Sequence, residues 1–432
     1  MSSLRFKYLI KVEPGENNNK YYKMTENADS TFTVIYGRVG AAKPQTKTYP
    51  IREWDSTYRE KISARKGYVD QTDLFSEIKT VVTQQAGPDY ICDDTTVSNL
   101  IIALRGYAKD NTAKTYLVKA ESVTQAQIDR AQQHIDKLVD ISQQKIVNVD
   151  EFNKVLLDLF RTIPRTMKEI GEHLVYGENG TFNIKTKKFE GNGKMKTLAQ
   201  IKQEIDAIIN DEQSNLDTMA SQVIKPQAVA QSNSNSTQKV SLLQAMGLNL
   251  KVCTDKPTLE NVKRLAQEHS RRVRAVFEIS NATTQKAFDS HVTKAQNKKT
   301  ELFWHGSRNQ NWWWIIQQGL KIRPSNAVYT GSMFGDGIYF ASECDKSMGY
   351  TDSGRWVRGN GTDRVYMALY NVHVGRQYET LRSDSYLSAN KLKTLGGYDS
   401  TWGKKGPSLM RHEYIIYNSD QSTIKYLVEF SN

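Results

Sequence analysis

The residues best suited to chemistry lie in the C-terminal third of the chain, in three separate segments. His305 ends a predicted strand in FWHGSR, Tyr339 lies in GDGIYF, and Glu413 lies in HEYIIY. An ionised carboxylate can accept a hydrogen bond from a hydroxyl group while its charge stabilises a positive charge that develops during bond cleavage. Taken singly, however, a tyrosine or histidine in a strand is more often a packed core residue, and Glu413 could equally be an exposed strand carboxylate.

Other motifs in the chain give weaker signals. The glycine-rich stretch around Gly397 lacks the spacing and the hydroxyl group of a phosphate-binding loop, and the GNG triplets at Gly191 and Gly359 lack the third glycine of a dinucleotide fingerprint. The histidines include no pair at metal-ligand spacing, and the three cysteines lie far apart. We therefore expect neither a metal site nor a disulfide framework.

Length and composition describe a folded, basic protein. At roughly 150 residues per domain, 432 residues suggest about three domains. Lys and Arg number 59 against 47 Asp and Glu, and the resulting charge of +12 attracts polyanions such as nucleic acid, although a merely soluble basic protein fits the same numbers. No uninterrupted apolar stretch is long enough to span a membrane, so we expect no membrane partner.

The pattern along the chain predicts an α+β protein with three domains. Residues 1–86 should form a small antiparallel sheet domain, 90–225 a helical domain, and 240–432 a mainly antiparallel, β-rich domain, with a linker or loop at 226–239. The strand candidates in the first domain are 5–12, 20–24 and 31–38, and those in the last are 273–279, 301–305, 364–370, 413–417 and 424–430.

The helical domain is predicted from its capping signals and apolar spacing. Thr124 and Gln127 have the spacing of a capping box, and a second helix must end near Pro164. A third helix should begin at Thr197 and bury a stripe of apolar residues that includes Leu198. These stripes indicate core packing, and the segment itself shows no chemistry.

Basic and aromatic residues are concentrated near the N-terminus. Arg38, Lys43 and Lys47 fall in a segment without acidic residues, and Tyr36 lies beside them. This combination suits phosphate contacts and stacking on an exposed base or sugar. A solvated charged surface is the alternative interpretation.

Taken together, these segments resemble a known family. FWHGSRNQNWWWIIQQGLKI, TGSMFGDGIYFASECDKSMGY and HEYIIYN resemble the catalytic domain of the poly(ADP-ribose) polymerases, whose His, Tyr and Glu triad falls on His305, Tyr339 and Glu413. YGRVGAAKPQTKTYP and KGYVD resemble the WGR domain of the short, DNA-dependent members, with Tyr36 where the family has Trp. Tyrosine keeps the aromatic face but loses the indole donor. VTQAQI and LFRTIP are similar to segments of the family's helical regulatory domain.

The resemblance implies that NAD is the substrate and that the triad cleaves it. Glu413 would stabilise the oxocarbenium-like transition state as the bond between nicotinamide and ribose breaks, and would orient the acceptor ribose during chain elongation. His305 would hold the adenosine-side ribose, and Tyr339 would pack against the nicotinamide-side ribose. Tyr350 would stack on the nicotinamide ring.

The remaining site residues are also implied by the resemblance. Gly306 and Ser347 would bind the nicotinamide amide, and Met333 would line the acceptor pocket. Ser307, Asn311 and Lys321 match positions on the adenosine side, where the family usually has Arg in place of Lys321. Lysine keeps the positive charge but lacks the planar guanidinium group with which arginine makes two parallel hydrogen bonds. The DNA-binding residues would be Tyr36, Arg38, Lys43 and Lys47.

The expected function is therefore a DNA-break-stimulated transferase that builds poly(ADP-ribose) on proteins, itself included. The implied partners are DNA ends or nicks, acceptor proteins and poly(ADP-ribose), and the helical domain would cover the NAD site until DNA binds. A mono(ADP-ribosyl)transferase and a DNA-end-binding module with a degenerate catalytic domain are the alternatives. The sequence leaves open whether the acceptor is Glu/Asp or Ser and whether a partner protein completes the site. The family implies a nuclear location, and a nucleoid or cytoplasmic one also fits.

Overall fold

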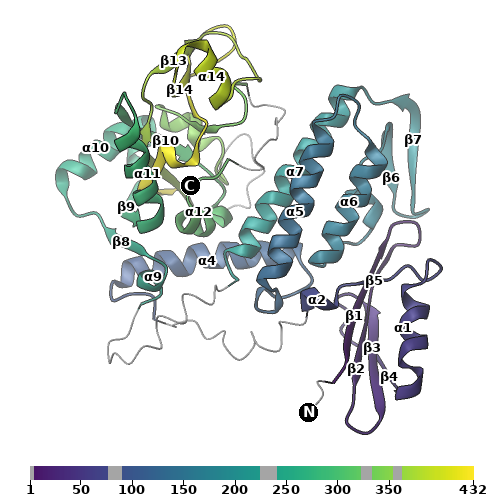
Figure 1. Cartoon of the computed structure of the whole chain (residues 1–432). Coiled ribbons are helices and arrows are strands. Elements are labelled where there is room, and N and C mark those ends of the chain that lie inside the picture. The colour runs from purple at the N-terminus through teal and green to yellow at the C-terminus, as the bar shows by residue number, and fades with distance from the viewer. Residues whose placement is uncertain (1–3, 76–89, 224–240, 323–332, 354–361) are drawn as a thin grey trace. The chain divides into compact units, whose positions relative to one another are not determined.

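The computed structural model forms two compact units (Figure 1). It describes residues 4–75, 90–223, 241–322, 333–353 and 362–432. The N-terminal unit comprises Met1–Gln85 and Thr112–Leu216, and the C-terminal unit comprises Ala86–Asn111 and Asp217–Asn432. The predicted linker at 226–239 lies outside the described residues, as do residues 76–86 of the predicted first domain. The three domain boundaries drawn from the sequence stay predictions.

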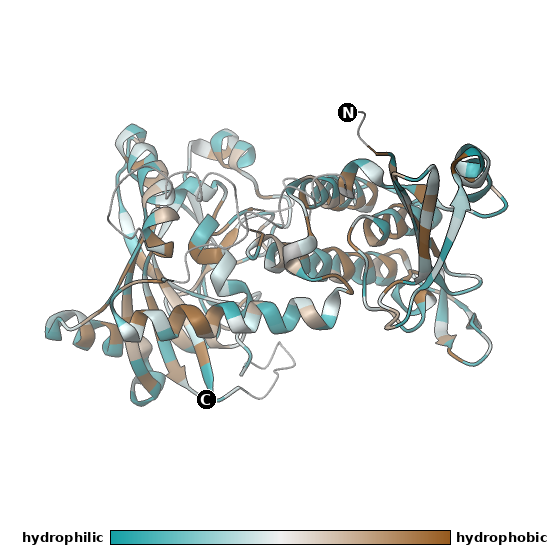
Figure 2. Cartoon of the chain, turned by 90° about the horizontal axis from the view of Figure 1, so that it is seen from below, coloured by the Kyte–Doolittle hydropathy of each residue, from teal (hydrophilic) through white to brown (hydrophobic). Residues whose placement is uncertain are grey.

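A five-stranded antiparallel sheet opens the N-terminal unit, as the sequence predicts. Its spatial order is β4-β3-β2-β1-β5, with bounds β1 Phe6–Glu13, β2 Asn18–Glu26, β3 Thr31–Arg38, β4 Gln45–Pro50 and β5 Val69–Asp70. Alternate residues such as Leu9, Met24 and Phe32 are buried on one face. Helix α1 (Trp54–Ile62) is mostly hydrophilic (Figure 2) and packs there through Trp54, whose ring lies 5.2 Å from that of Phe32.

Helices make up most of the remaining N-terminal unit. They are α2 (Thr72–Phe75), α5 (Gln125–Ser142), α6 (Val149–Thr162) and the part of α7 (Leu198–Ala220) up to Leu216. The predicted capping box is present, because the backbone N–H of Gln127 donates to the Thr124 hydroxyl and the Gln127 side chain accepts from the Thr124 N–H. Helix α6 ends two residues before Pro164.

One helix face is predicted wrongly. Leu198, which the sequence analysis places inward, is 46% exposed, whereas Ile205, Ile209 and Leu216 are buried. The apolar spacing identifies the buried stripe in the middle of α7, but it does not show that the first turn of the helix extends beyond the packed region.

A two-stranded hairpin interrupts the helical segment. Strands β6 (Glu178–Asn183) and β7 (Lys188–Met195) pair antiparallel (Figure 1), and most of their residues are exposed. The sequence analysis does not foresee it, because strands exposed on both faces lack the alternation of a half-buried strand.

The C-terminal unit contains two sheets. The larger one has the order β10-β12-β16-β9-β8 and is antiparallel throughout, and the smaller one has the order β11-β15-β14-β13, in which only β13 and β14 are parallel. The bounds are β8 Leu248–Val252, β9 Val273–Asn281, β10 Thr300–Gly306, β11 Ile338–Phe340, β12 Arg364–His373, β13 Gln377–Thr380, β14 Ser400–Gly403, β15 Glu413–Ile416 and β16 Ser422–Ser431. Antiparallel sheets combined with helices confirm the predicted α+β class.

Helices flank these sheets, and one of them comes from the segment that the sequence analysis assigns to the helical domain. Val97, Leu100, Ile101 and Leu104 on α4 (Thr95–Thr115) belong to the buried core of the C-terminal unit. The other helices are α9 (Leu242–Ala245), α10 (Lys256–Ala266), α11 (Ala282–Lys294), α12 (Trp312–Gln318), α13 (Cys344–Met348) and α14 (Ala389–Gly396). Short 3-10 helices include η3 (Ile170–His173) and η5 (Gln267–Arg272). In the described part of the chain, no helix has both the length and the apolar character needed to cross a membrane.

Candidate functional site

The candidate site lies where the two sheets of the C-terminal unit meet. Trp304 on β10 and Ala341, just after β11, exchange two backbone hydrogen bonds of 2.8 and 3.0 Å. This bridge places His305 next to Tyr339, although 34 residues separate them, and the Nδ1 atom of His305 lies 3.0 Å from the carbonyl oxygen of Tyr339. Two of the three predicted catalytic residues are therefore brought together by backbone pairing.

The His305 ring has a defined protonation state. Burial lowers its pKa to about 4, so the ring is neutral at physiological pH. A carbonyl oxygen can only accept, so Nδ1 carries the proton and Nε2 keeps its lone pair. The rings of Trp312, Phe340 and Tyr370 lie 5.8 to 6.5 Å from the imidazole centroid and fix its position. The result is an oriented hydrogen-bond acceptor.

Gly306 allows strand β10 to approach helix α13 closely. A Cβ atom at this position would lie 1.9 Å from the carbonyl oxygen of Ser347, so no larger residue fits without a backbone shift. Ser347 is buried, and its hydroxyl donates to the carbonyl of Trp304 at 3.2 Å. The two residues predicted to bind one amide group are therefore neighbours in space.

Tyr339 is fixed through its phenol. Its hydroxyl donates to the carbonyl oxygen of Gly335 at 2.7 Å and accepts from the backbone N–H of Phe334 at 3.0 Å. Gly335 has a φ of 75° and an added Cβ would lie 1.9 Å from the carbonyl oxygen of Leu387, so the turn requires glycine. With its hydroxyl committed to this turn, the phenol of Tyr339 is fixed in orientation.

Glu413 is buried, with 8% of its surface exposed. Its Oε1 atom accepts a hydrogen bond from the Lys346 ammonium at 2.6 Å, and that ammonium also donates to the carbonyls of Arg411 and His412. Its Oε2 atom is buried and has no hydrogen-bond partner among the described residues. The alternative of an exposed strand carboxylate is therefore wrong, and one carboxylate oxygen is left without a hydrogen-bond partner among the described residues.

Strand pairing places Glu413 and Tyr339 on the same face of the smaller sheet. Tyr339 lies directly opposite Ile415 in the β11–β15 pair, and directly opposed residues point to the same side of a sheet. Glu413 is two residues from Ile415 on β15, and residues two apart share a face. Diagonal neighbours of this kind have Cα atoms about 7–8 Å apart, so a sugar-sized group could contact both side chains.

Tyr350 extends this arrangement beyond the triad. It is 49% exposed, and partial desolvation and then the charge of Glu413 raise the pKa of its phenol. Its backbone N–H donates to the carbonyl of Ser347 at 3.1 Å. A ring that is half-exposed and electrostatically coupled to Glu413 can stack on a planar ligand.

The other predicted ligand-binding residues surround these positions. Ser307 directly follows β10, Asn311 ends the 3-10 helix Asn309–Asn311, and the Asn311 amide donates to the Ser307 hydroxyl at 3.0 Å. Met333 and Tyr339 pack against one apolar cluster around Phe334. Lys321 is exposed.

The predicted DNA-binding residues differ in accessibility. Lys43 and Lys47 are exposed on the turn into β4 and on β4 itself. The guanidinium of Arg38 donates to the carbonyls of Asn17, Met167 and Lys168, so it braces the sheet against the helical part of its own unit. Tyr36 is half-buried, with its ring 5.6 Å from that of Tyr22. Lys43 and Lys47 are thus exposed without the carbonyl contacts that hold Arg38.

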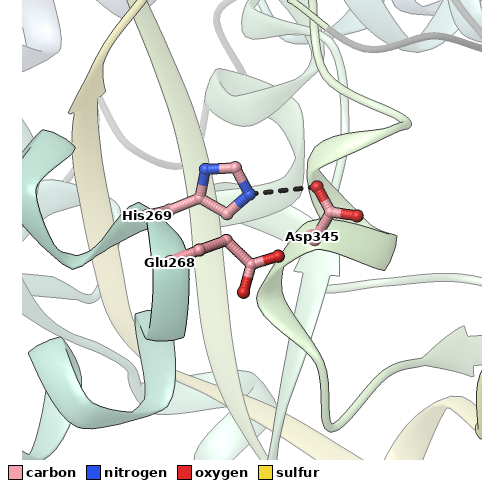
Figure 3. Close-up of side chains that lie close together, drawn as sticks. All are labelled: Glu268, His269 and Asp345. Atoms are coloured by element: carbon pink, nitrogen blue, oxygen red, sulfur yellow. Dashed lines mark hydrogen bonds and ion pairs between the residues drawn. The ribbon is translucent and has the colours of Figure 1, made fainter.

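A group of potential metal ligands lies beside α13 (Figure 3). One ligand atom from each of Glu268, His269 and Asp345 falls within 4.8 Å of the others. Arg272 lies 3.2 Å from the His269 Nδ1 atom, and a guanidinium can only donate, so Nδ1 accepts and the Nε2–H donates to Asp345 at 3.1 Å. The second oxygen of Asp345 binds Arg411 at 2.6 Å. These contacts form an ionic network that ties α13 to the segment before β15.

Sequence reasoning gives no role to Lys346 or Arg411, although both lie next to predicted site residues. Lys346 directly precedes Ser347 and forms an ion pair with Glu413. Arg411, two residues before Glu413, forms an ion pair with Asp345. The signal that could have identified them is a basic residue within two positions of a predicted site residue.

Comparisons with known proteins agree with this geometry. The family model of the poly(ADP-ribose) polymerase catalytic domain matches residues 258–408, and that of the WGR domain matches 6–73. His305, Tyr339 and Ser347 lie inside the first match, and Glu413 lies five residues beyond it.

Relatives of this chain occur in a virus and in plants. A putative poly(ADP-ribose) polymerase-like protein, 100L, of Invertebrate iridescent virus 6 is 34% identical over 161 residues, which are 36% of this chain and 84% of the relative. The uncharacterised protein 101L of the same virus is 33% identical over 154 residues, 36% of this chain and 61% of the relative. Poly(ADP-ribose) polymerase 2-A of rice is 32% identical over 181 residues, 36% of this chain and only 26% of the rice enzyme.

The fold and the matched domain define an NAD-dependent ADP-ribosyltransferase that also carries a WGR domain. NAD is its substrate. The chain belongs to the poly(ADP-ribose) polymerase family.

Proposed function

We propose that this chain is a DNA-break-stimulated enzyme that transfers ADP-ribose from NAD to proteins and extends it into poly(ADP-ribose), with release of nicotinamide, in the response to DNA damage. The observation that carries the proposal is the state of Glu413. It is a buried carboxylate with one oxygen held by Lys346 and the other without a partner among the described residues. It also shares a sheet face with Tyr339.

The proposed reaction breaks the bond between the nicotinamide nitrogen and C1′ of its ribose. The bonding electrons leave with nicotinamide, and positive charge develops on the sugar, as in glycoside cleavage. The free oxygen of Glu413 accepts a hydrogen bond from a ribose hydroxyl, and its negative charge stabilises the developing cation. An oxygen of the acceptor side chain then forms the new bond to C1′; a serine hydroxyl releases its proton to solvent in this step, whereas an ionised carboxylate has none to release.

His305 and Tyr339 are proposed to position NAD. The Nε2 lone pair of the neutral His305 ring can accept a hydrogen bond from a hydroxyl of the adenosine-side ribose, while the Nδ1–H stays on Tyr339. The ring of Tyr339 packs against the other ribose. Gly306 and Ser347 supply the donor and acceptor that the nicotinamide amide needs.

Substitution of Glu413 tests this proposal. Glu413→Gln keeps the shape but removes the charge, so we expect NAD turnover to fall by at least about 100-fold and elongation to disappear. Glu429→Gln is the matched control, because Glu429 is also a buried glutamate of this unit, paired with Arg364. Turnover should be measured as nicotinamide release. Full activity in Glu413→Gln would refute the proposed role.

The products separate polymer synthesis from the two alternatives. Radiolabelled NAD should give a ladder of products for a polymerase and one band for a mono(ADP-ribosyl)transferase. A DNA-end-binding module with a degenerate catalytic domain would give no labelled protein. Glu413 supports the polymerase, because the family uses this carboxylate to orient the acceptor ribose.

Stimulation by DNA is proposed for the WGR domain, with Lys43 and Lys47 as phosphate contacts and Tyr36 and Arg38 beside them. Turnover should rise when a 5′-phosphorylated broken duplex is added. Replacing both lysines by glutamine should raise the DNA concentration needed for half-maximal stimulation and leave basal turnover unchanged. Equal stimulation of the variant and the parent would exclude these contacts.

We further propose that the helical segment restrains the NAD site until DNA binds. Removing all of 90–225 would also remove α4, whose Ile101 and Leu104 lie in the core of the C-terminal unit. A sharper variant replaces 112–216 with a short Gly/Ser linker. The side chain of Gln222 donates to the carbonyl of Ala108, so the two cut ends are close together. This variant should be active without DNA, and a persisting need for DNA would refute the restraint.

The proposed partners follow from the same function. They are DNA ends or nicks, acceptor proteins including the chain itself, the growing poly(ADP-ribose), and a partner protein if one completes the site. Location would be nuclear in a eukaryotic cell and otherwise cytoplasmic or at the nucleoid. Mass analysis of the modified chain would identify the acceptor as Glu/Asp or Ser.

A further inference from the structure

The hairpin β6–β7 is a basic ribbon that the reaction does not use. Residues 178–196 contain five lysines and two glutamates. Lys185, Lys188 and Lys194 are exposed, and none of them takes part in an ion pair with another described residue. The carboxylate of Glu190 already accepts hydrogen bonds from Asn183 and Thr186. The hairpin therefore presents positive charge that its own acidic residues do not neutralise.

Packing holds this ribbon in place near its turn. The ring of Phe189 stacks on Tyr176 at 4.1 Å, and the Tyr176 hydroxyl donates to the carbonyl of Gly171 in η3. Lys187 forms an ion pair with Glu169, which is buried. At the other end of the hairpin the backbone N–H of Lys196 donates to the carbonyl of Gly177, and the Lys196 ammonium pairs with Glu204. The ribbon is therefore held at both ends, while most of its residues stay exposed.

Residues 168–170, at the start of η3, join the hairpin to the N-terminal sheet. Asn17, in the turn between β1 and β2, donates to the carbonyl of Lys168 and accepts from the N–H of Ile170. Arg38 donates to the same carbonyl of Lys168. Residues 168–170 thus lie against the end of the sheet where β3 finishes, and Glu169 binds the hairpin from there. The hairpin and the basic end of the sheet are neighbours within one unit.

From this arrangement we propose that the hairpin β6–β7 is a second contact for duplex DNA, and that Lys185, Lys188 and Lys194 bind its phosphates. This inference rests on the proposed DNA response. An exposed two-stranded ribbon is one of the shapes that the major groove of B-DNA admits. Nucleic acid is favoured over an acidic protein because the hairpin adjoins the domain proposed to bind DNA, so one duplex could contact both.

The salt dependence of DNA binding tests the proposal. Each phosphate contact contributes about −0.9 to the slope of log K against log salt. The full-length variant K185Q/K188Q/K194Q should therefore have a slope shallower by up to about 2.7, measured by fluorescence anisotropy with a labelled broken duplex. The matched control K256Q/K286Q/K298Q changes three exposed lysines of the C-terminal unit and should keep the parental slope.

Two further variants separate the outcomes. K185R/K188R/K194R keeps the charge and should restore the parental slope, which a merely structural role of the lysines would not explain. An unchanged slope in the glutamine variant, alongside weakened binding by K43Q/K47Q, would overturn this inference and leave the proposed DNA response intact. Absence of DNA binding by the parent would overturn both. Equal competition by polyglutamate and DNA, per unit charge, would overturn the choice of nucleic acid.

Discussion

The neutral state of His305 makes the stability of the C-terminal unit depend on pH in a calculable way. The folded ring has a pKa of about 4 because of burial, against 6.5 for the exposed side chain. Between these values the unfolded chain binds a proton that the folded chain does not bind, so the free energy of unfolding falls as the pH decreases. A tenfold change in proton affinity is worth about 1.4 kcal/mol. From about pH 7.5 to about pH 5, His305 should therefore cost the folded unit about 2 kcal/mol.

The variant His305→Asn isolates this contribution. Asparagine cannot titrate in this range, and its amide can still donate toward the carbonyl of Tyr339. His134, His173 and His291 also have lowered pKa values from burial, but they are present in both proteins and their effects cancel in the difference. The loss of stability between the two pH values should be about 2 kcal/mol smaller in the variant.

Tryptophan fluorescence during urea unfolding is a suitable measurement. Of the seven tryptophans, all except Trp54 belong to the C-terminal unit, so the signal reports mainly on the unit that contains His305. The dependence of the unfolding free energy on urea concentration must be compared at both pH values, because a chain with two units need not unfold in one step. If His305→Asn lost as much stability as the parent on acidification, the ring would not be neutral in the folded protein, and its proposed role as an acceptor would fail.

Two other predictions concern the contacts around the site. Gly306→Ala should destabilise the C-terminal unit by about 1–3 kcal/mol and raise the KM for NAD, because the added Cβ would overlap the carbonyl of Ser347. The control is Gly106→Ala, whose added Cβ meets nothing within 4 Å, and both variants should be compared by thermal unfolding and enzyme kinetics. Lys346→Met alone should destabilise by about 3–5 kcal/mol by leaving the Glu413 charge buried without its partner, whereas the added change Glu413→Leu should restore or exceed parental stability without restoring activity. Additive destabilisation in the double variant would contradict this view of the pair.

Five strands of the C-terminal unit could be predicted from sequence because they are rich in apolar residues, and four of them are seven residues or longer. Strands β9, β10, β12, β15 and β16 all fall at their predicted positions. Strands β11, β13 and β14 are not predicted, because three or four residues show no clear period of two; β15 is equally short and is predicted from its apolar run alone. Their existence depends on tertiary pairing, which no local pattern encodes.

The candidate site shows the same division between what local sequence encodes and what depends on contacts between distant segments. The residue types of the triad were identified through a resemblance, and their local sequences agree with the strands that carry them. Their convergence depends on the bridge between Trp304 and Ala341 and on the register of β11 with β15, which join residues far apart in the chain. The protonation of His305 and the ion pair of Glu413 follow from burial and therefore emerge only in the folded structure.

The buried pair of Lys346 and Glu413 also bears on the choice between an enzyme and a degenerate domain. Taking two charges out of water is unfavourable, and well-packed apolar residues in their place are often equally or more stabilising. The unpartnered Oε2 atom of Glu413 adds a desolvation cost of about 1–3 kcal/mol. A domain that only binds DNA or senses NAD gains nothing from this arrangement. An enzyme that must hold an anion against a developing cation gains an oriented charge without having to reorganise during the reaction, and this physical advantage favours the catalytic interpretation.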